Sequence, residues 1–376
     1  MTITILTPDL SGNCVGRALV LAELFGAVGE VKVVGHQYGE EVWRPMSSSR
    51  LNCGRLTGRT WAGLAKDFPR NRAHIDSEVV VVSKRLASSW IYAHAISRSG
   101  RRLVLDFDDD ERGLHHSLPL MVRTLGPIKN ILRPNSYLWS VLADRATWPK
   151  APILVASSGL QRRYGGELLY HLRSTEMLTG GVITEALRRD LKRLSGVQSL
   201  VFVGTPRRHK GLDVLAKAVR HVRDKYTVVL GVFGCDEVEG VSAQLRTYLP
   251  DEAFVCHGQI PLNCVAEVLG AATAVVIPQQ RGRGAQQQTP AKLFDAMCLG
   301  RPLITTDVGD IAKIVSDSAI VVREPSDVTE TANAIELLLG SAERRKNLSL
   351  AIRQRFDRFY ATDKVRGRIL SSVLGT

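Results

Sequence analysis

The 376-residue chain lacks several features that would assign it to a simple class of protein. No run of about eighteen apolar residues occurs, so we expect no membrane-spanning helix. The six cysteines are scattered without a CxxC pair, which argues against a zinc site or a disulfide framework and favours free thiols in a reducing cytoplasm. The opening residues, MTITILTPDLSG, have no basic segment before an apolar one, so we predict no signal peptide.

Aromatic residues are also scarce, at 6% of the chain, whereas basic residues are abundant. Lysine and arginine number 50 against 37 aspartates and glutamates, which gives a formal net charge of +13. Such an excess suits a nucleic acid, an anionic membrane surface or small anionic substrates such as nucleoside diphosphates. Because the basic residues are dispersed and not interleaved with aromatics, and no helix-turn-helix pattern occurs, nucleic acid is not predicted as a partner.

The most informative stretch runs from Val275 to Gly309 and reads as strand, loop, helix and strand. Two apolar β-type runs flank a loop rich in glycine and glutamine and an amphipathic segment. Thr289 is a good N-cap, Pro290 suits the first helical position, and Gly300 suits the left-handed turn after a helix. We therefore predict a helix over about 290–299, whose N-terminus would favour a phosphate at the C-terminal edge of a parallel sheet.

This stretch resembles the donor-binding motif of GT-B glycosyltransferases, especially the large retaining group called family four. The resemblance rests on the order T-P-x-K-L-F-D-A-M-x-x-G-x-P-x-I-x-T-D-V-G. It implies two acids eight positions apart, the first for the donor sugar and the second for the nucleotide ribose. Here these positions hold Gln287 and Asp295, so an amide that keeps hydrogen bonding but carries no charge replaces the first acid. Gln288 and Thr289 are assigned to the same donor site; the alternative is a plain Rossmann-type helix with polar surface residues.

A second motif, GTPRRHKG, begins at Gly204 directly after a predicted strand. It resembles the family's Gly-Arg-x-x-x-x-Lys-Gly, in which the two cations neutralise the donor's phosphates. Lys210 falls at the lysine position, whereas Thr205 occupies the arginine position, so either Arg207 or Arg208 substitutes or the charge is reduced. Cations are needed there because the departing nucleoside diphosphate gains negative charge. A basic surface turn is the alternative.

Two further loops are assigned to the site by resemblance. The segment HGQIP at 257–261 resembles the family's loop against the nucleobase, where backbone groups of Gln259 or Ile260 would read the base edge. Gly12 lies in the loop after the first strand, which faces the inter-domain cleft in this family and holds donor or acceptor. A simple tight turn is the alternative for Gly12. The dinucleotide fingerprint GxGxxG is absent from this loop.

An acidic run, DFDDDE at 106–111, ends a predicted strand of the first half, where ligands bind in such folds. It is open to three interpretations. A DxD site would hold Mg²⁺ or Mn²⁺ through carboxylates. A solvated turn would cap the next helix. By resemblance, Asp108 stands where many family members have a histidine at the cleft, and it would contact the donor sugar or take the acceptor's proton.

These patterns predict an α/β protein of GT-B architecture, with two Rossmann-like, doubly wound parallel-sheet domains facing a cleft. We place an acceptor-side domain at 1–190, with a C-terminal helix at about 361–376 packing back on it. A donor-binding domain is placed at 197–360. The resemblance covers the second domain well, from about residue 200 to 322, and the first one loosely.

The predicted reaction is transfer of a sugar from a nucleoside diphosphate sugar, such as a UDP-sugar, to a hydroxyl group of a glycan, lipid-linked or small-molecule acceptor. Retention of configuration is implied by the family. We predict no cofactor and no metal, since Lys210 and an arginine would carry the diphosphate. The alternatives are a sugar-nucleotide epimerase or hydrolase, using Asp108 to Asp110 with His115 and His116, and a non-catalytic nucleotide-sugar-binding protein.

A basic and apolar segment at 129–139 allows two interpretations of where the protein works. A packed helical hairpin is the first. In the second, the segment rests on anionic lipid, which would place this cytoplasmic protein at the inner face of the membrane.

Overall fold

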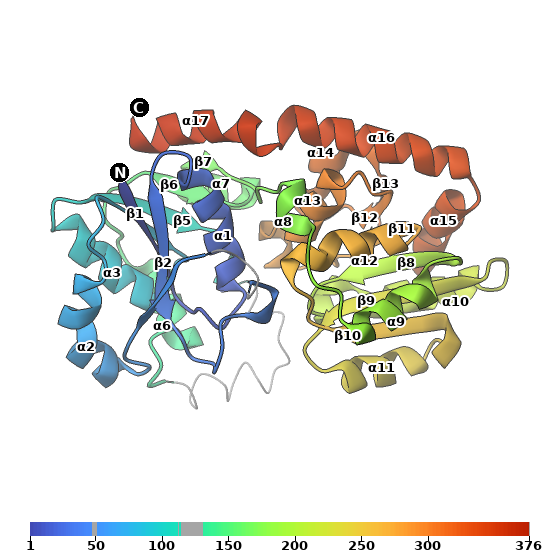
Figure 1. The fold of residues 1–376 in the computed structure, drawn as a ribbon, viewed down its shortest axis with the longest axis horizontal. Coiled ribbons are helices and arrows are strands. Elements are labelled where there is room, and N and C mark those ends of the chain that lie inside the picture. Colours follow the sequence, from blue (N-terminus) through green and yellow to red (C-terminus); the bar gives the residue numbers. More distant parts are fainter. Residues whose placement is uncertain (47–50, 112, 114–130, 376) are drawn as a thin grey trace. The chain divides into compact units, whose positions relative to one another are not determined.

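The structure is a computed structural model that describes residues 1–46, 51–111, 113 and 131–375 (Figure 1). The chain divides into two compact units: the first comprises Met1–Leu172 with Val365–Thr376, and the second comprises Arg173–Lys364. Each unit is built on its own parallel sheet. The prediction of two Rossmann-like α/β domains is therefore confirmed.

Seven strands form the sheet of the first unit, in the order β3-β2-β1-β4-β5-β6-β7, and all neighbouring pairs are parallel. Its central strands are buried along almost their whole length, as expected for a parallel sheet with both faces covered. The strands are β1 (Thr2–Thr7), β2 (Glu30–His36), β3 (Cys53–Leu56), β4 (Val79–Ser83), β5 (Arg102–Phe107), β6 (Ile153–Val155) and β7 (Glu167–Leu168).

Helices of the first unit connect these strands, and the last helix of the chain belongs mostly to it. Arg366 donates to the backbone oxygen and to the carboxylate of Glu23, both at 3.0 Å, and Arg102 donates to the backbone oxygen of Leu374 at 2.7 Å. These bonds fix α17 within the first unit. The elements are α1 (Cys14–Phe25), α2 (Trp61–Ala73), α3 (Ala87–Ser97), α6 (Tyr137–Arg145), α7 (Ser158–Tyr164), α17 (Thr362–Leu374) and the 3-10 turn η1 (Arg44–Met46).

Six parallel strands form the sheet of the second unit, in the order β10-β9-β8-β11-β12-β13. The order reverses beside β8, the first strand of the unit, so the loops after β8 and β11 leave adjacent strands at the same edge. The strands are β8 (Gln198–Val203), β9 (Val228–Cys235), β10 (Phe254–Gly258), β11 (Ala274–Ile277), β12 (Leu303–Thr306) and β13 (Ile320–Val322).

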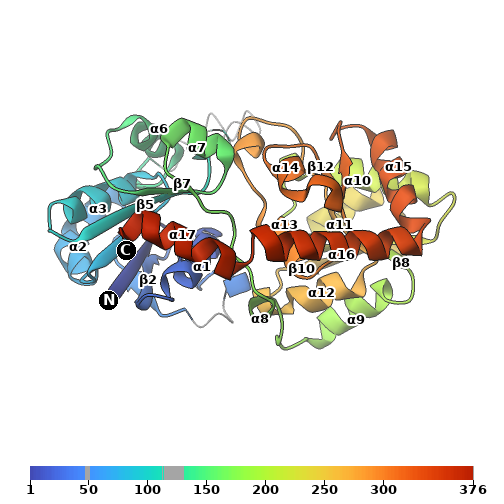
Figure 2. The ribbon, with the colours of Figure 1, turned by 90° about the horizontal axis from the view of Figure 1, so that it is seen from above.

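The helices of the second unit pack on this sheet and on one another. α10 packs on α15, and α13 packs on α16, which is the long red helix of this unit in Figure 2. The helices are α8 (Thr175–Leu178), α9 (Glu185–Leu194), α10 (Leu212–Val222), α11 (Val238–Arg246), α12 (Val265–Ala271), α13 (Ala291–Cys298), α14 (Ile311–Val315), α15 (Val328–Leu339) and α16 (Ala342–Phe359). The 3-10 turns are η2 (Arg208–Lys210), η3 (Asp251–Ala253), η4 (Leu262–Cys264), η5 (Ala285–Gln287) and η6 (Ser316–Ser318).

The boundary between the units differs from the predicted end of the first domain at residue 190. Residues 173–190 lie in the second unit because α9 contacts β9, β10 and α12, while α8 contacts η4. Leu187 and Leu194 of α9 are the buried side chains that attach this helix. A short connecting segment with two buried leucines gave too weak an apolar pattern to show which sheet it covers.

The predicted helix of the donor motif is confirmed as α13, with one correction at its start. Pro290 has extended backbone angles and occupies the N-cap position, so Thr289 lies one residue before the cap and does not cap the helix. Gly300 has the predicted left-handed conformation, with φ +58°.

Of the segment at 129–139, residues 129 and 130 lie outside the described residues, as do His115 and His116. The part that is described leads into α6. None of the helices in the described part of the chain combines the length and apolar content that crossing a bilayer requires.

Candidate functional site

The candidate site lies at the C-terminal edge of the sheet in the second unit. Parallel strands end at a common edge, where the connecting loops can gather polar groups around a ligand. The loop after β8 carries Gly204 and η2, and the loop after β11 leads through η5 into α13. Of the residues predicted for the second unit, Asp295 lies in α13, Gln259 and Ile260 lie in the loop after β10, and the others lie in these two loops.

Lys210 is held in place by two glutamines of the loop after β11. Its Nζ donates to Gln279 Oε1 at 3.1 Å and to Gln288 Oε1 at 2.9 Å. Gln279 is fully buried, its Nε2 donates to the backbone oxygen of Ala285 at 3.0 Å, and its own backbone oxygen accepts from Thr306 at 2.6 Å. The ammonium group therefore has a fixed position. Sequence reasoning missed Gln279, although a polar side chain two residues beyond a buried strand is a recognisable signal.

The backbone around Lys210 requires glycine. Gly211 has φ +66°, and a Cβ atom there would lie 2.1 Å from the backbone oxygen of Pro278. The loop after β8 thus packs directly against the loop after β11, which brings Lys210 to the two glutamines.

Arg207 and Arg208 are exposed at the start of the same turn. Neither guanidinium forms a hydrogen bond or ion pair with any residue that the structure describes. Thr205, which stands at the family's arginine position, is half-buried and carries no charge. Substitution by one of these two arginines stays a prediction.

Gln287, Gln288 and Thr289 form the end of the loop that precedes α13. Backbone bonds shape this loop: the amide of Gln287 donates to Gly284 at 3.1 Å and that of Gln288 donates to Ala285 at 3.2 Å. The side chains of Gln287 and Gln288 are half-buried, and Thr289 is buried. Lys210 and Gln288 are thus brought together, while the contact of Gln287 with a donor sugar stays a prediction.

Asp295 lies one turn into α13 and is fully buried. Its Oδ1 accepts a hydrogen bond from Nε of Arg173, a residue that is also buried. Its Oδ2 has no hydrogen-bond donor among the described residues, and Lys292 Nζ lies 3.8 Å away. The carboxylate therefore faces two cations. Sequence reasoning missed both of them, because Arg173 is 122 positions away in the chain and Lys292 was counted only as part of the motif.

Gly204 and Lys292 are neighbours at the edge of the sheet. Gly204 has φ +143°, and a Cβ atom there would lie 3.8 Å from Lys292 Cε. Lys292 is partly exposed, and burial of its stem lowers the pKa of its ammonium group. The side chain of Lys292, in the first turn of α13, thus lies close to the backbone at the end of β8.

The loop predicted to meet the nucleobase follows β10. The side chain of Ile260 is buried, and contact of its backbone with a base stays a prediction. The neighbouring Gln259 donates to Asp236 at 2.5 Å, and His257 is hydrogen-bonded through Nδ1 to Asp190 at 2.7 Å. These contacts hold the loop against the second unit and explain His257 as a packed residue.

A separate charged cluster occupies the C-terminal edge of the first unit's sheet. Lys84 Nζ lies 3.1 Å from Asp108, 2.7 Å from Asp109 and 3.0 Å from Glu111. Lys84 is buried and has φ +65°, which is rare for a residue with a side chain, and its amide donates to the backbone oxygen of Asp106 at 2.7 Å.

Burial dominates the electrostatics of this cluster. It raises the pKa of Asp108 to about 7, although the nearby Lys84 acts in the opposite direction. It also raises the pKa of the Cys14 thiol to about 12. In the described part of the chain no group of three or more histidine, cysteine, aspartate or glutamate side chains is arranged to hold a metal ion. The acids of the DFDDDE run surround an ammonium group instead.

Gly12 of the first loop is explained by its neighbour. A Cβ atom on Gly12 would lie 2.9 Å from Asp9 Oδ2. The Asp9 carboxylate shapes the loop by accepting from the amide of Ser11 at 2.9 Å and from that of Tyr38 at 3.3 Å. This geometry favours the tight-turn interpretation of Gly12.

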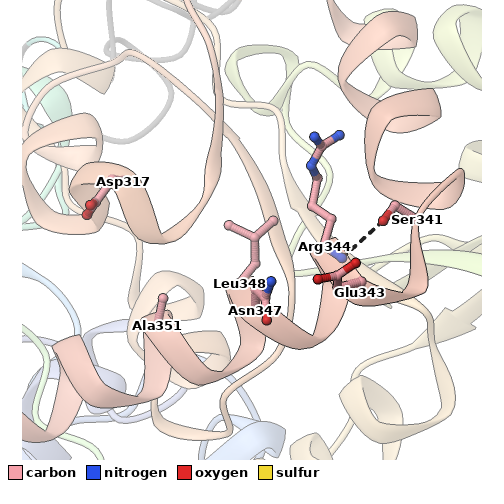
Figure 3. A pocket seen from close by; sticks show the side chains of 7 residues that line it. All are labelled: Asp317, Ser341, Glu343, Arg344, Asn347, Leu348 and Ala351. Atoms are coloured by element: carbon pink, nitrogen blue, oxygen red, sulfur yellow. Dashed lines mark hydrogen bonds between the residues drawn. The ribbon is translucent and has the colours of Figure 1, made fainter.

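A hollow of about 370 Å³ lies on the surface of the second unit near the start of α16 (Figure 3). The hollow is lined by Asp317, Ser341, Glu343, Arg344, Asn347, Leu348 and Ala351. Among these residues, Ser341 accepts a hydrogen bond from the backbone amide of Arg344 at 3.1 Å. No residue predicted for the site lines this hollow, so it is separate from the strand edge described above.

The sequence of the second unit matches a known family. Residues 197–341 match the family described as glycosyl transferases group 1. The second unit carries a glycosyl transferases group 1 domain. This match spans β8 to α15 and includes Gly204, Lys210 and Asp295, while the first unit lies outside it.

Two curated glycosyltransferases are similar over part of the chain. The alpha-D-kanosaminyltransferase of Streptomyces kanamyceticus is 25% identical over 177 residues, which is 44% of this chain and 43% of that protein. The putative teichuronic acid biosynthesis glycosyltransferase TuaC of Bacillus subtilis is 24% identical over 151 residues, which is 40% of this chain and 35% of that protein. The matched region therefore spans less than half the length of either relative.

Solved structures share the fold over the full chain. Sucrose-phosphate synthase from Thermosynechococcus elongatus has a TM-score of 0.73 at 14% identity and covers 100% of this chain and 99% of its own. Anabaena HepE in complex with UDP-glucose has a TM-score of 0.75 at 12% identity, with 100% of both chains covered. The predicted GT-B architecture is thus confirmed.

Proposed function

We propose that the protein is a glycosyltransferase that moves a sugar from a nucleoside diphosphate sugar to a hydroxyl acceptor with retention of configuration. The observation that carries this proposal is the fixed ammonium group of Lys210, held by Gln279 and Gln288 beside the loop that leads into α13. A cation and a helix N-terminus at one sheet edge suit the two phosphates of such a donor. HepE, a structural neighbour, was solved with UDP-glucose, which makes a UDP-sugar the first donor to test.

In the proposed reaction, the bond between the sugar's anomeric carbon and the β-phosphate oxygen breaks, and a bond to the acceptor oxygen forms. The acceptor's proton passes to the leaving phosphate or to a nearby base. Lys210 stabilises the charge that grows on the leaving diphosphate, and Gln287 donates a hydrogen bond to the donor sugar. The backbone of Ile260 meets the base, and cationic side chains carry the diphosphate without a metal.

Asp108 of the first unit is proposed to contact the sugar or to take the acceptor's proton. Its position at the end of β5 and its raised pKa support this role, since a base with a pKa near 7 is suited to accept a proton at neutral pH. The metal-site interpretation of the same acids has less support because Lys84 lies among them.

A product assay tests the proposal. Purified protein is incubated with UDP-, GDP-, ADP-, TDP- and CDP-sugars, with and without a panel of hydroxyl acceptors, and release of the nucleoside diphosphate is measured. Release that depends on an acceptor, with a product whose anomeric configuration matches the donor by NMR, is expected. Conversion without any acceptor would indicate an epimerase or hydrolase, and binding without turnover over the whole panel would indicate a non-catalytic protein.

We further propose that the first unit contacts anionic lipid through the segment around α6. Ile131, Leu132, Leu138 and Leu142 are exposed there, together with the basic residues Arg133 and Arg145. Apolar side chains flanked by basic ones suit the boundary between lipid headgroups and acyl chains. Co-sedimentation with phosphatidylglycerol vesicles and its loss in Leu132→Asp/Leu142→Asp would support this contact. Equal recovery with phosphatidylcholine vesicles would refute it.

A further inference from the structure

The donor site described above has one fixed cation, Lys210, whereas a leaving diphosphate carries negative charge on two phosphates. A nucleoside diphosphate leaves with its charge spread over two phosphates, and the arginine position of the motif is filled by Thr205. Arg207 and Arg208 are exposed and have no partner among the described residues that would hold them at the site. A second cation that is already held at the strand edge therefore has to come from another segment.

Lys292 meets the geometric requirements for this cation. It lies in the first turn of α13, where the free amides of the helix already favour an anion. Its Cε is 3.8 Å from the position of a Cβ on Gly204, at the end of β8 and six residues before Lys210. Its Nζ makes no hydrogen bond with any described residue and is partly exposed. An ammonium group without hydrogen bonds to the protein keeps its three N–H donors for a ligand.

Asp295 and Arg173 hold this lysine in position. Asp295 Oδ2 lies 3.8 Å from Lys292 Nζ, while its Oδ1 accepts from the buried Arg173. The three side chains carry one negative and two positive charges, so one positive charge is left over. Because Asp295 is fully buried and Lys292 is not, the surplus charge is presented at the surface by the lysine.

We infer that Lys292 binds the diphosphate of the donor as the second cation, and that Asp295, anchored by Arg173, is a positioning residue for Lys292. The inference rests on the proposed function. It assigns the cation missing at Thr205 to the first turn of α13 and gives the buried carboxylate a role that its burial permits. Burial lowers the pKa of the Lys292 ammonium, and a bound phosphate would restore it.

Calorimetric titration of the full chain with UDP and with UMP tests this assignment. Where UDP does not bind, the GDP and GMP pair and the ADP and AMP pair are used. In the wild-type protein the diphosphate should bind more tightly than the monophosphate. Loss of one charge-assisted bond in Lys292→Ala should weaken diphosphate binding by about 10- to 100-fold and leave monophosphate binding nearly unchanged. Lys292→Gln serves the same purpose if Lys292→Ala lowers the folded fraction.

Lys346→Ala is the matched control. Lys346 is an exposed lysine of α16 in the same unit, with no partner among the described residues, so its removal changes the net charge equally without touching the site. Its ratio of monophosphate to diphosphate dissociation constants should equal that of the wild type. A similar loss in Lys346→Ala and Lys292→Ala would overturn the assignment, because it would show a general effect of charge.

Asp295→Asn tests the positioning role with a readout that a merely structural residue would not move. In the wild-type background it should lower the preference for diphosphate over monophosphate. In the Lys292→Ala background it should have no further effect on that preference. Asp295→Glu, which keeps the charge, should restore part of it. Additive losses in the double variant would overturn the role of Asp295.

The outcomes separate this inference from the function on which it rests. If the wild type binds a diphosphate and Lys292→Ala keeps the wild-type preference within about threefold, the inference fails and the glycosyltransferase proposal stands. If the wild type binds no nucleoside diphosphate of the series, the proposed function fails, and the inference fails with it.

Discussion

Replacement of Lys210 by alanine is the perturbation whose effect follows most directly from the structure. The ammonium group is held by Gln279 at 3.1 Å and Gln288 at 2.9 Å, so it is in place before the donor binds. A preorganised cation costs no rearrangement when charge develops on the leaving group. Removal of one such donor typically lowers kcat by about 10² to 10³, which corresponds to about 3–4 kcal/mol of transition-state stabilisation. We expect Lys210→Ala to fall in this range.

The cost to folding should be much smaller than the cost to turnover. Gln279 keeps its bond to the backbone oxygen of Ala285 in the variant, and Lys210 is only half-buried. Loss of the two bonds from Lys210 should lower the free energy of unfolding by about 1–2 kcal/mol. Urea denaturation measures this term separately from kinetics, so a fall in kcat cannot be mistaken for loss of folded protein.

The assay is the initial rate of nucleoside diphosphate release with the preferred donor and acceptor. The variant should lose kcat about a hundredfold or more, whereas removal of an exposed neighbour in Arg207→Ala or Arg208→Ala should lower it less than about tenfold. A kcat for Lys210→Ala within about threefold of wild type would refute the donor-site assignment. An equally large loss in Arg208→Ala would show that an arginine of the loop supplies the second cation.

Four further predictions concern charge and backbone. Burial raises the pKa of Asp108 to about 7, so kcat should rise with pH through about 7 if Asp108 takes the acceptor's proton, and Asp108→Asn should lose this dependence. Because this pKa lies above the ordinary value of 3.8, the stability that protonated Asp108 contributes is complete below about pH 4 and is lost as the pH rises through about 7. Urea denaturation at several pH values would detect this loss as a fall in the free energy of unfolding with rising pH. The fall should be absent in Asp108→Asn. Lys84→Met leaves three acids without their cation and should lower the free energy of unfolding by about 3–5 kcal/mol, and a loss below 1 kcal/mol would contradict the buried ion-pair account. Gly211→Ala should destabilise the protein more than Gly100→Ala does. Both glycines have positive φ, but only at Gly211 would a Cβ atom meet a backbone oxygen, at 2.1 Å. Equal melting temperatures of the two variants would contradict this.

The sequence predicted the parts of the fold that depend on local patterns. Apolar runs of the right length gave the strands, and Pro290 and Gly300 marked the limits of α13 to within a residue. The two motifs placed Lys210 and Gln288 at one edge, and the structure brings them together. The N-cap was wrong because Pro290 itself takes the extended conformation that precedes a helix, which moves the cap one residue on.

Long-range partners could not be predicted, because nothing local specifies them. The pairing of Arg173 with Asp295 joins a connecting segment to a helix far along the chain, and an arginine in such a segment resembles any surface arginine. The same holds for Lys84, whose positive φ and three acidic neighbours follow from the close packing of β4 and β5. The domain boundary was misplaced for a related reason, since α9 is assigned to a unit by what it packs against and not by its own sequence.

The most direct test of the central claim is a thermal-shift measurement with UDP, GDP, ADP, TDP and CDP on wild-type protein and on Lys210→Ala. A ligand at 100 times its dissociation constant stabilises the folded state by about 2.7 kcal/mol, which is a clear rise in melting temperature. We expect such a rise with one nucleoside diphosphate for the wild type and a reduced rise for the variant. No rise with any of the five, or an equal rise in both proteins, would contradict a nucleotide-sugar site at Lys210.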